Sequence, residues 1–182
     1  MTRQRRLLAV TAAVGAAVAF SATASTASPA TDLTGGGRDS VFEQLSGYHE
    51  TPLTLSTSGA GRFFATINDR TQEITYRLSY SELVGTVTQA HIHLGGSAMT
   101  GGVSVFLCSN LGNGPAGTQV CPPAPATVTG TLRAVDVIGP VAQGITAGEF
   151  AELTKAIRAG ATYVNVHSTT YPGGEIRAQL DR

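Results

Sequence analysis

Basic residues are scarce in this chain, and none of them cluster beyond its first few positions. Of the 12 Lys and Arg residues, three precede Leu7, which leaves nine against 12 Asp and Glu in the rest of the sequence. Binding to nucleic acid requires grouped basic side chains that neutralise phosphates. The mildly acidic remainder therefore excludes nucleic acid as an expected partner.

Catalytic signatures are also missing. The chain has no GxSxG, HExxH or Walker-type glycine motif, and these patterns place a nucleophile, a zinc-dependent base or a phosphate loop. Only two cysteines occur, Cys108 and Cys121, and we expect both to be consumed in a disulfide. No thiol is then free to act as a nucleophile. We expect no enzymatic turnover.

Residues 1–27 are typical of an export signal. A basic start before Leu7 precedes an apolar stretch that runs to Phe20, and small residues follow up to Ala27. The apolar stretch is shorter than the roughly 20 residues of a spanning helix, so we expect cleavage near Ala27 and no membrane span afterwards. The adjacent Arg5 and Arg6 leave both the Sec and the twin-arginine routes open. The protein is predicted to be secreted.

Export places Cys108 and Cys121 in an oxidising setting, where a disulfide is the simple interpretation. The alternative is a pair of thiolate metal ligands, but tight zinc sites favour the CxxC spacing, which these two residues lack. The chain between and after them is rich in Gly, Asn and Pro and needs a covalent tie.

The remainder of the chain divides into a short leader and one β-rich domain. Residues 28–40 are small, polar and glycine-rich, and are expected to be flexible. Residues 41–182 consist of short runs of Val, Ile, Thr, Tyr and Phe between turn-forming residues, which indicates an all-β domain. We predict strands near 41–46, 53–57, 61–68, 72–80, 87–94, 102–108, 128–135, 162–168 and 174–180.

One segment departs from the β pattern. Thr146 and Glu149 have the spacing of a capping box, and Phe150, Leu153 and Ile157 then recur at helical intervals. The pattern predicts one short amphipathic helix packed on the sheet.

Three of the four histidines are placed for convergence. His91 and His93 alternate with apolar neighbours, so both imidazoles project from one face of a strand. His167 ends a second alternating run that begins at Tyr163. If the two runs are neighbours, three imidazoles meet, and such a set suits one Zn(II) or Cu(II) ion. His49 or water would supply a fourth ligand.

The C-terminal runs predict a polar face beside these histidines. If they form a hairpin with His167 opposite Glu175, Asn165 falls opposite Arg177 and Tyr163 opposite Gln179. In the metal hypothesis, Glu175 or Asn165 accepts the second ring proton of an imidazole. In the alternative hypothesis, the histidines, Glu175, Arg177 and Asn165 form a purely structural network of hydrogen bonds. Glu50 is interpreted as a carboxylate that bonds backbone or Arg177, and the alternative is a general acid or base near the cluster.

Four motifs in order resemble the CHRD domain, named after chordin. They are Leu45–Pro52 (LSGYHETP), Ala90–Gly95 (AHIHLG), Tyr163–Ser168 (YVNVHS) and Gly173–Leu180 (GGEIRAQL). The resemblance spans 41–182 and implies an extracellular all-β domain of poorly defined role, here a secreted bacterial member. The chain departs from the usual pattern at His49 and Leu53, so His49 is not carried over as a family site.

The HxH strand also resembles, locally, the copper-binding strand of copper/zinc superoxide dismutases. With the CHRD resemblance it leads us to expect an antiparallel, Greek-key-like β-sandwich, superoxide-dismutase-like or immunoglobulin-like, with one short helix.

Three functions follow from these observations. The first is a secreted, non-catalytic CHRD-type protein whose histidine cluster binds copper or zinc. The second is an extracellular protein-binding module in which the same residues are structural. The third is a copper-dependent redox protein resembling superoxide dismutase, although the bridging histidine and zinc-side ligands of the two-metal enzymes have no counterparts here.

Overall fold

The computed structural model describes residues 38–181, and the predicted signal at 1–27 lies outside them. Within this part of the chain, eight strands and one α-helix form the domain. They are β1 (Arg38–Ser46), β2 (Ala60–Asn68), β3 (Glu73–Ser81), β4 (Val87–Leu94), β5 (Gly102–Ser109), β6 (Ala126–Leu132), α1 (Phe150–Arg158), β7 (Thr162–Ser168) and β8 (Ile176–Gln179). Residues 38–40, assigned to the leader, belong to β1, and the rest of the leader is outside the described residues.

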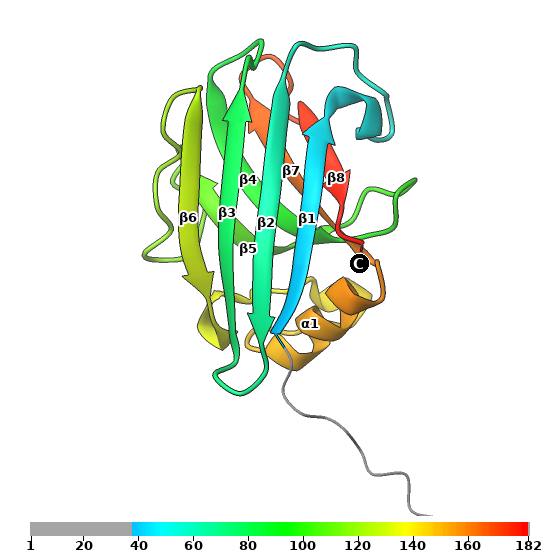
Figure 1. Ribbon diagram of the computed structural model, residues 1–182, viewed down its shortest axis with the longest axis vertical. Helices are drawn as coiled ribbons and strands as arrows, with labels where there is room; N and C mark the ends of the chain where they lie inside the picture. Colours follow the sequence, from blue (N-terminus) through cyan, green and yellow to red (C-terminus); the bar gives the residue numbers. More distant parts are fainter. Residues whose placement is uncertain (1–37, 182) are drawn as a thin grey trace, which may run out of the picture. The chain divides into compact units, whose positions relative to one another are not determined.

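The strands form one antiparallel sheet in the order β5-β4-β7-β8-β1-β2-β3-β6. Figure 1 shows its two halves lying over one another, with β1, β2, β3 and β6 in one layer and β4, β5, β7 and β8 in the other. The all-β antiparallel prediction is confirmed. The expected separate sheets of a sandwich are instead one sheet, because Ser46 of β1 pairs with Arg177 of β8. Strands β5 and β6 approach each other at the other side, so the barrel is nearly closed.

The core lies between the two layers. Alternation assigns the residues of β7 and β8 to two sides: Val164, Val166, Ile176 and Ala178 join the apolar core, and the polar residues between them face away from it. The polar side of β4, β7 and β8 is therefore outside the barrel wall, where loops cover it. This is where the candidate site lies.

Helix α1 lies near the end of the barrel where β1 begins (Figure 1). It buries Phe150, Leu153 and Ile157, as its spacing predicted. Its last residue, Arg158, bonds Asp39 at 2.6 Å and Asp69 at 2.7 Å, which ties the helix to the start of β1 and to the β2–β3 turn.

The predicted capping box forms only in part. The Glu149 carboxylate accepts a hydrogen bond from the Thr146 N–H at 2.5 Å, but the helix begins after Glu149 and has no side-chain cap bond of its own. The described part of the chain contains no helix that is long and apolar enough to cross a membrane.

The predicted strand at 53–57 is wrong: this segment is a loop. A further strand there has no partner, because β1 pairs with β2 along one edge and with β8 along the other. The loop is held by other bonds, from Leu55 N–H to the Gly47 carbonyl at 2.9 Å and from Thr57 Oγ1 to the Glu175 carboxylate at 2.8 Å.

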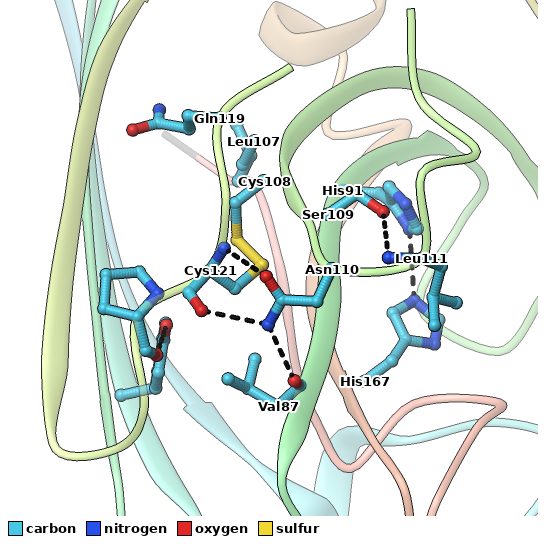
Figure 2. The surroundings of a disulfide bond; sticks show 12 residues. Val87, His91, Leu107, Cys108, Ser109, Asn110, Leu111, Gln119, Cys121 and His167 are labelled. Atoms are coloured by element: carbon cyan, nitrogen blue, oxygen red, sulfur yellow. Dashed lines mark hydrogen bonds between the residues drawn. A yellow bond between two sulfur atoms is a disulfide. The ribbon is translucent and has the colours of Figure 1, made fainter.

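The predicted disulfide between Cys108 and Cys121 is confirmed. It joins the end of β5 to the loop that leads to β6. Figure 2 shows Asn110 beside it: the Asn110 amide donates to the carbonyls of Val87 and Cys121 and accepts from the Cys121 N–H. The loop is thereby fixed both to the end of β5 and to the start of β4.

Replacing both cysteines with serine should lower the free energy of unfolding by about 3 kcal/mol, since the disulfide closes a loop across a separation of 13 residues. Urea unfolding of the oxidised wild type and of the double variant measures this. Wild type in reductant is the matched control and should unfold with the double variant. Coincident curves for oxidised wild type and variant would show that the disulfide contributes nothing.

Candidate metal centre

The three predicted histidines lie on two neighbouring strands. Strand β4 carries His91 and His93, and β7 carries His167. The antiparallel register places His91 opposite Asn165 and His93 opposite Tyr163. Because β4 and β7 pair directly, all three imidazoles project from one face of the sheet into the same space.

Two irregularities in β5 flank the same positions. Ala90 pairs with Cys108 but His91 pairs with Phe106, and Ile92 pairs with Val105 but His93 with Val103. One residue of β5 is therefore extra beside each histidine. Such bulges bend a strand and redirect its side chains, so β5 curves around the β4 segment that carries the imidazoles.

The imidazoles meet in a buried cluster, as predicted. His91, His93 and His167 are 2%, 7% and 6% exposed. One nitrogen from each lies within 4.8 Å of those of the other two, a spacing at which the group could hold a metal ion. His91 Nδ1 and His167 Nε2 are 3.2 Å apart, and Figure 2 shows these two rings facing each other.

Backbone carbonyls determine which nitrogen carries the proton in two of the rings. His93 Nδ1 is 2.9 Å from the Gly101 oxygen, and His167 Nδ1 is 2.9 Å from the Pro172 oxygen. A carbonyl oxygen only accepts, so each Nδ1 is a donor and each Nε2 of the neutral ring is a lone pair. Among the described residues, His93 Nε2 and His91 Nε2 have no hydrogen-bond partner.

Burial keeps these rings neutral. Burial is the main cause and the neighbouring imidazoles a lesser one, and together they lower the pKa of His91 to about 2 and that of His93 to about 4. Burial also lowers the pKa of His167, against the bond to the Pro172 carbonyl. Neutral imidazole is the form that binds metal ions.

A stack of side chains fixes the His93 ring. The ring lies parallel to that of Tyr163, with centroids 4.7 Å apart and 4° between the planes. The Arg177 guanidinium covers Tyr163, 3.4 Å from its centroid. Arg177 also donates to Thr51 Oγ1 at 2.5 Å and to the Gly96 and Met99 carbonyls at 2.8 and 3.0 Å. Arg177 thus joins β8 to the loop at 95–101.

The Asn165 side chain lies inside the cluster. Its Oδ1 is 3.0 Å from His167 Nε2. Its Nδ2 lies near the Glu50 carboxylate and favours the charged form of that group. Glu50 Oε1 makes no hydrogen bond among the described residues. Glu50 is buried, which raises its pKa to about 7, while the charge of Arg177, the Thr51 N–H and Asn165 oppose the rise. The sequence pattern missed this arrangement, because nothing local relates the loop residue Glu50 to β7.

Two predicted site residues lie elsewhere. His49 is exposed and is not part of the group of nitrogens; it ends a short 3-10 turn (Gly47–His49) that carries its ring outward. Glu175 is buried, but its Oε1 accepts from Thr57 Oγ1 at 2.8 Å and from the Val84 N–H at 2.6 Å. Strand β8 begins only at Ile176, after a positive φ at Gly174, so strand alternation does not extend to the Glu175 carboxylate.

Comparison with known proteins identifies a family and no individual relative. The CHRD domain model matches residues 41–180. No curated protein and no solved structure matches this chain. The matched range holds all three clustered histidines, the disulfide and every strand from β2 to β8. The chain belongs to the CHRD domain family.

Proposed function

We propose that this domain binds one transition-metal ion, Zn(II) or Cu(II), through His91, His93 and His167. The observation that carries the proposal is the pair of Nδ1–H bonds from His93 and His167 to backbone carbonyls. Metal-ligating histidines commonly donate their other ring proton to a carbonyl or carboxylate, which sets the tautomer and the ring orientation. Here both bonds turn an Nε2 lone pair into the cluster.

The spacing of the nitrogens supports the same proposal. Two nitrogens bonded to one tetrahedral ion at about 2.0–2.1 Å lie roughly 3.3 Å apart. His91 Nδ1 and His167 Nε2 are 3.2 Å apart. The third nitrogen, from His93, lies within 4.8 Å of these two. Binding of an ion would therefore shorten the distances between the His93 nitrogen and the other two. Imidazole ligands suit both zinc and copper, and affinity order favours copper.

The proposed role is ion binding by a secreted protein. Export is supported by the signal-like pattern before Ala27 and by the disulfide, which is typical of oxidising compartments.

A second candidate function is a protein-binding module in which the histidines are structural. It is favoured by the hydrogen bonds that the imidazoles make to backbone carbonyls. His93 and His167 each hold a loop carbonyl, that of Gly101 or of Pro172. A copper redox role would require the same ion and is secondary to its binding.

Titration of chelator-treated protein with Zn(II) and Cu(II) separates these functions. We expect one equivalent of either ion to bind. Loss of a group that hydrogen-bonds a metal ligand typically lowers metal affinity by about 10- to 100-fold. His93→Ala and His167→Ala each remove a ligand itself and should lower the affinity by more than this. Competition with a chromophoric chelator gives the affinity.

His49→Ala is the matched control, because His49 is exposed and outside the cluster. It should bind as wild type does. A wild type that folds and takes up neither ion, or a His93→Ala variant with unchanged affinity, would overturn the proposal and leave the structural network.

A further inference from the structure

The amide of Asn165 is held in one orientation between Glu50 and the imidazoles. Asn165 Nδ2 and Glu50 Oε1 lie 2.8 and 2.5 Å from the position that a Cβ on Gly174 would take, so both groups crowd over this glycine. An amide N–H donates to a carboxylate, whereas an amide oxygen facing it would be repelled. The Asn165 oxygen is therefore the atom that faces His167.

This orientation leaves His167 with oxygen acceptors at both ring nitrogens. The Pro172 carbonyl is 2.9 Å from Nδ1, and Asn165 Oδ1 is 3.0 Å from Nε2. A neutral imidazole has one N–H and can satisfy only one of them. A second ring proton would satisfy both, but it places a charge in a buried site, which is unfavourable. A metal cation beside Nε2 satisfies the lone pairs of the nitrogen and of the amide oxygen together.

The same oxygen is close to the other two ligands. Asn165 stands opposite His91 in the β4–β7 register. Its side chain also lies close to the His93 ring, although His93 Nε2 makes no hydrogen bond among the described residues. The 3.0 Å between Oδ1 and His167 Nε2 is near the roughly 3.3 Å expected between two ligands of one tetrahedral ion.

Resting on the proposed metal function, we infer that Asn165 Oδ1 is the fourth ligand, oriented by Glu50, and that it closes the coordination sphere against water. The site then has three nitrogens and one neutral oxygen. Such a set suits Zn(II) and Cu(II), whereas Cu(I) prefers soft sulfur ligands. A coordination sphere filled by protein atoms is typical of structural metal sites, whereas catalytic zinc sites keep one position for water.

Cobalt(II) substitution tests this inference through the pH dependence of the visible spectrum. Water bound to an ion in such a site titrates near neutral pH, at about pH 7 for zinc, and an amide ligand does not titrate. We expect the wild-type Co(II) spectrum to be constant through neutral pH. Asn165→Ala should admit water and gain a titration there, with affinity lowered more than about 100-fold.

Asn165→Asp retains an oxygen at the same position and should retain a spectrum that does not titrate. Asn113→Ala is the control, since Asn113 is an exposed amide that bonds Ser109 and Gln89. A wild type whose Co(II) spectrum already titrates, or an Asn165→Ala variant that matches wild type in spectrum and affinity, would refute the inference while leaving three-histidine binding intact. Failure of wild type to bind Co(II), Zn(II) and Cu(II) would instead refute the metal function itself.

Discussion

Replacing Arg177 with methionine is expected to lower the free energy of unfolding by at least about 3 kcal/mol, because three acceptors lose a charged donor at about 1–3 kcal/mol each. Arg177 is 1% exposed. Its guanidinium donates to Thr51 and to the carbonyls of Gly96 and Met99. Methionine fills a similar volume but leaves these acceptors without their donor, and removes the charge that faces Glu50.

Urea unfolding measures the Arg177 effect, and Arg77→Met is the matched control. Arg77 lies exposed on β3, so the same substitution there should change stability by less than about 0.5 kcal/mol. Because the guanidinium also covers Tyr163, which stacks on His93, the Arg177 variant should bind metal more weakly as well. Equal unfolding curves for the two methionine variants would show that the bonds of Arg177 contribute no stability.

Acid should destabilise the metal-free protein by several kcal/mol. An unfolded histidine binds a proton below pH 6.5, but His93 resists it until about pH 4 and His91 until about pH 2. Between those limits the unfolded chain holds more protons than the folded one, so stability falls as the pH falls. His93 alone contributes on the order of 3 kcal/mol, from a depression of about 2.5 pKa units. Bound metal should deepen the loss, because acid also displaces it.

Glu50 acts in the opposite direction and offers a check on the sign. Its pKa is 4.5 when unfolded and about 7 when folded. The folded protein therefore gains stability as the pH falls from about 7 to 4.5, which offsets one of the three histidines. Glu50→Gln removes this offset and should exceed wild type in stability most above pH 7, with the difference shrinking toward pH 4.5. Unfolding free energies across this range, in chelator, measure both effects. A wild type whose stability does not fall toward pH 4.5 would contradict the histidine effect, and a Glu50→Gln difference that is the same at every pH would contradict the Glu50 effect.

Local alternation was sufficient to predict much of the candidate site. It placed His91 and His93 on one face, and it gave the β7–β8 register, with Asn165 opposite Arg177 and Tyr163 opposite Gln179. Both inferences depend only on neighbours in the chain and on a period of two. Helical spacing, which is also a local pattern, located the helix at Phe150, Leu153 and Ile157.

The features that the sequence did not predict depend on contacts between segments that are distant in the chain. The exposure of His49 follows from a short turn, and the bonds of Glu175 follow from a loop at Thr57 and from Val84. The approach of Glu50 to Asn165 joins residues more than a hundred positions apart. The carbonyls that select the tautomers belong to every residue type, so no pattern of side chains marks Gly101 or Pro172 for that role. These features require the assembled barrel.

The two bulges of β5 have a consequence for solubility. Strand β5 is one edge of the sheet order, and a regular edge offers a row of free N–H and C=O groups on which another chain can add a strand. The extra residues beside His91 and His93 interrupt that row at two points, and the disulfide from Cys108 fixes its end. The curvature that shapes the histidine cluster thereby also makes this edge a poor template for fibril growth.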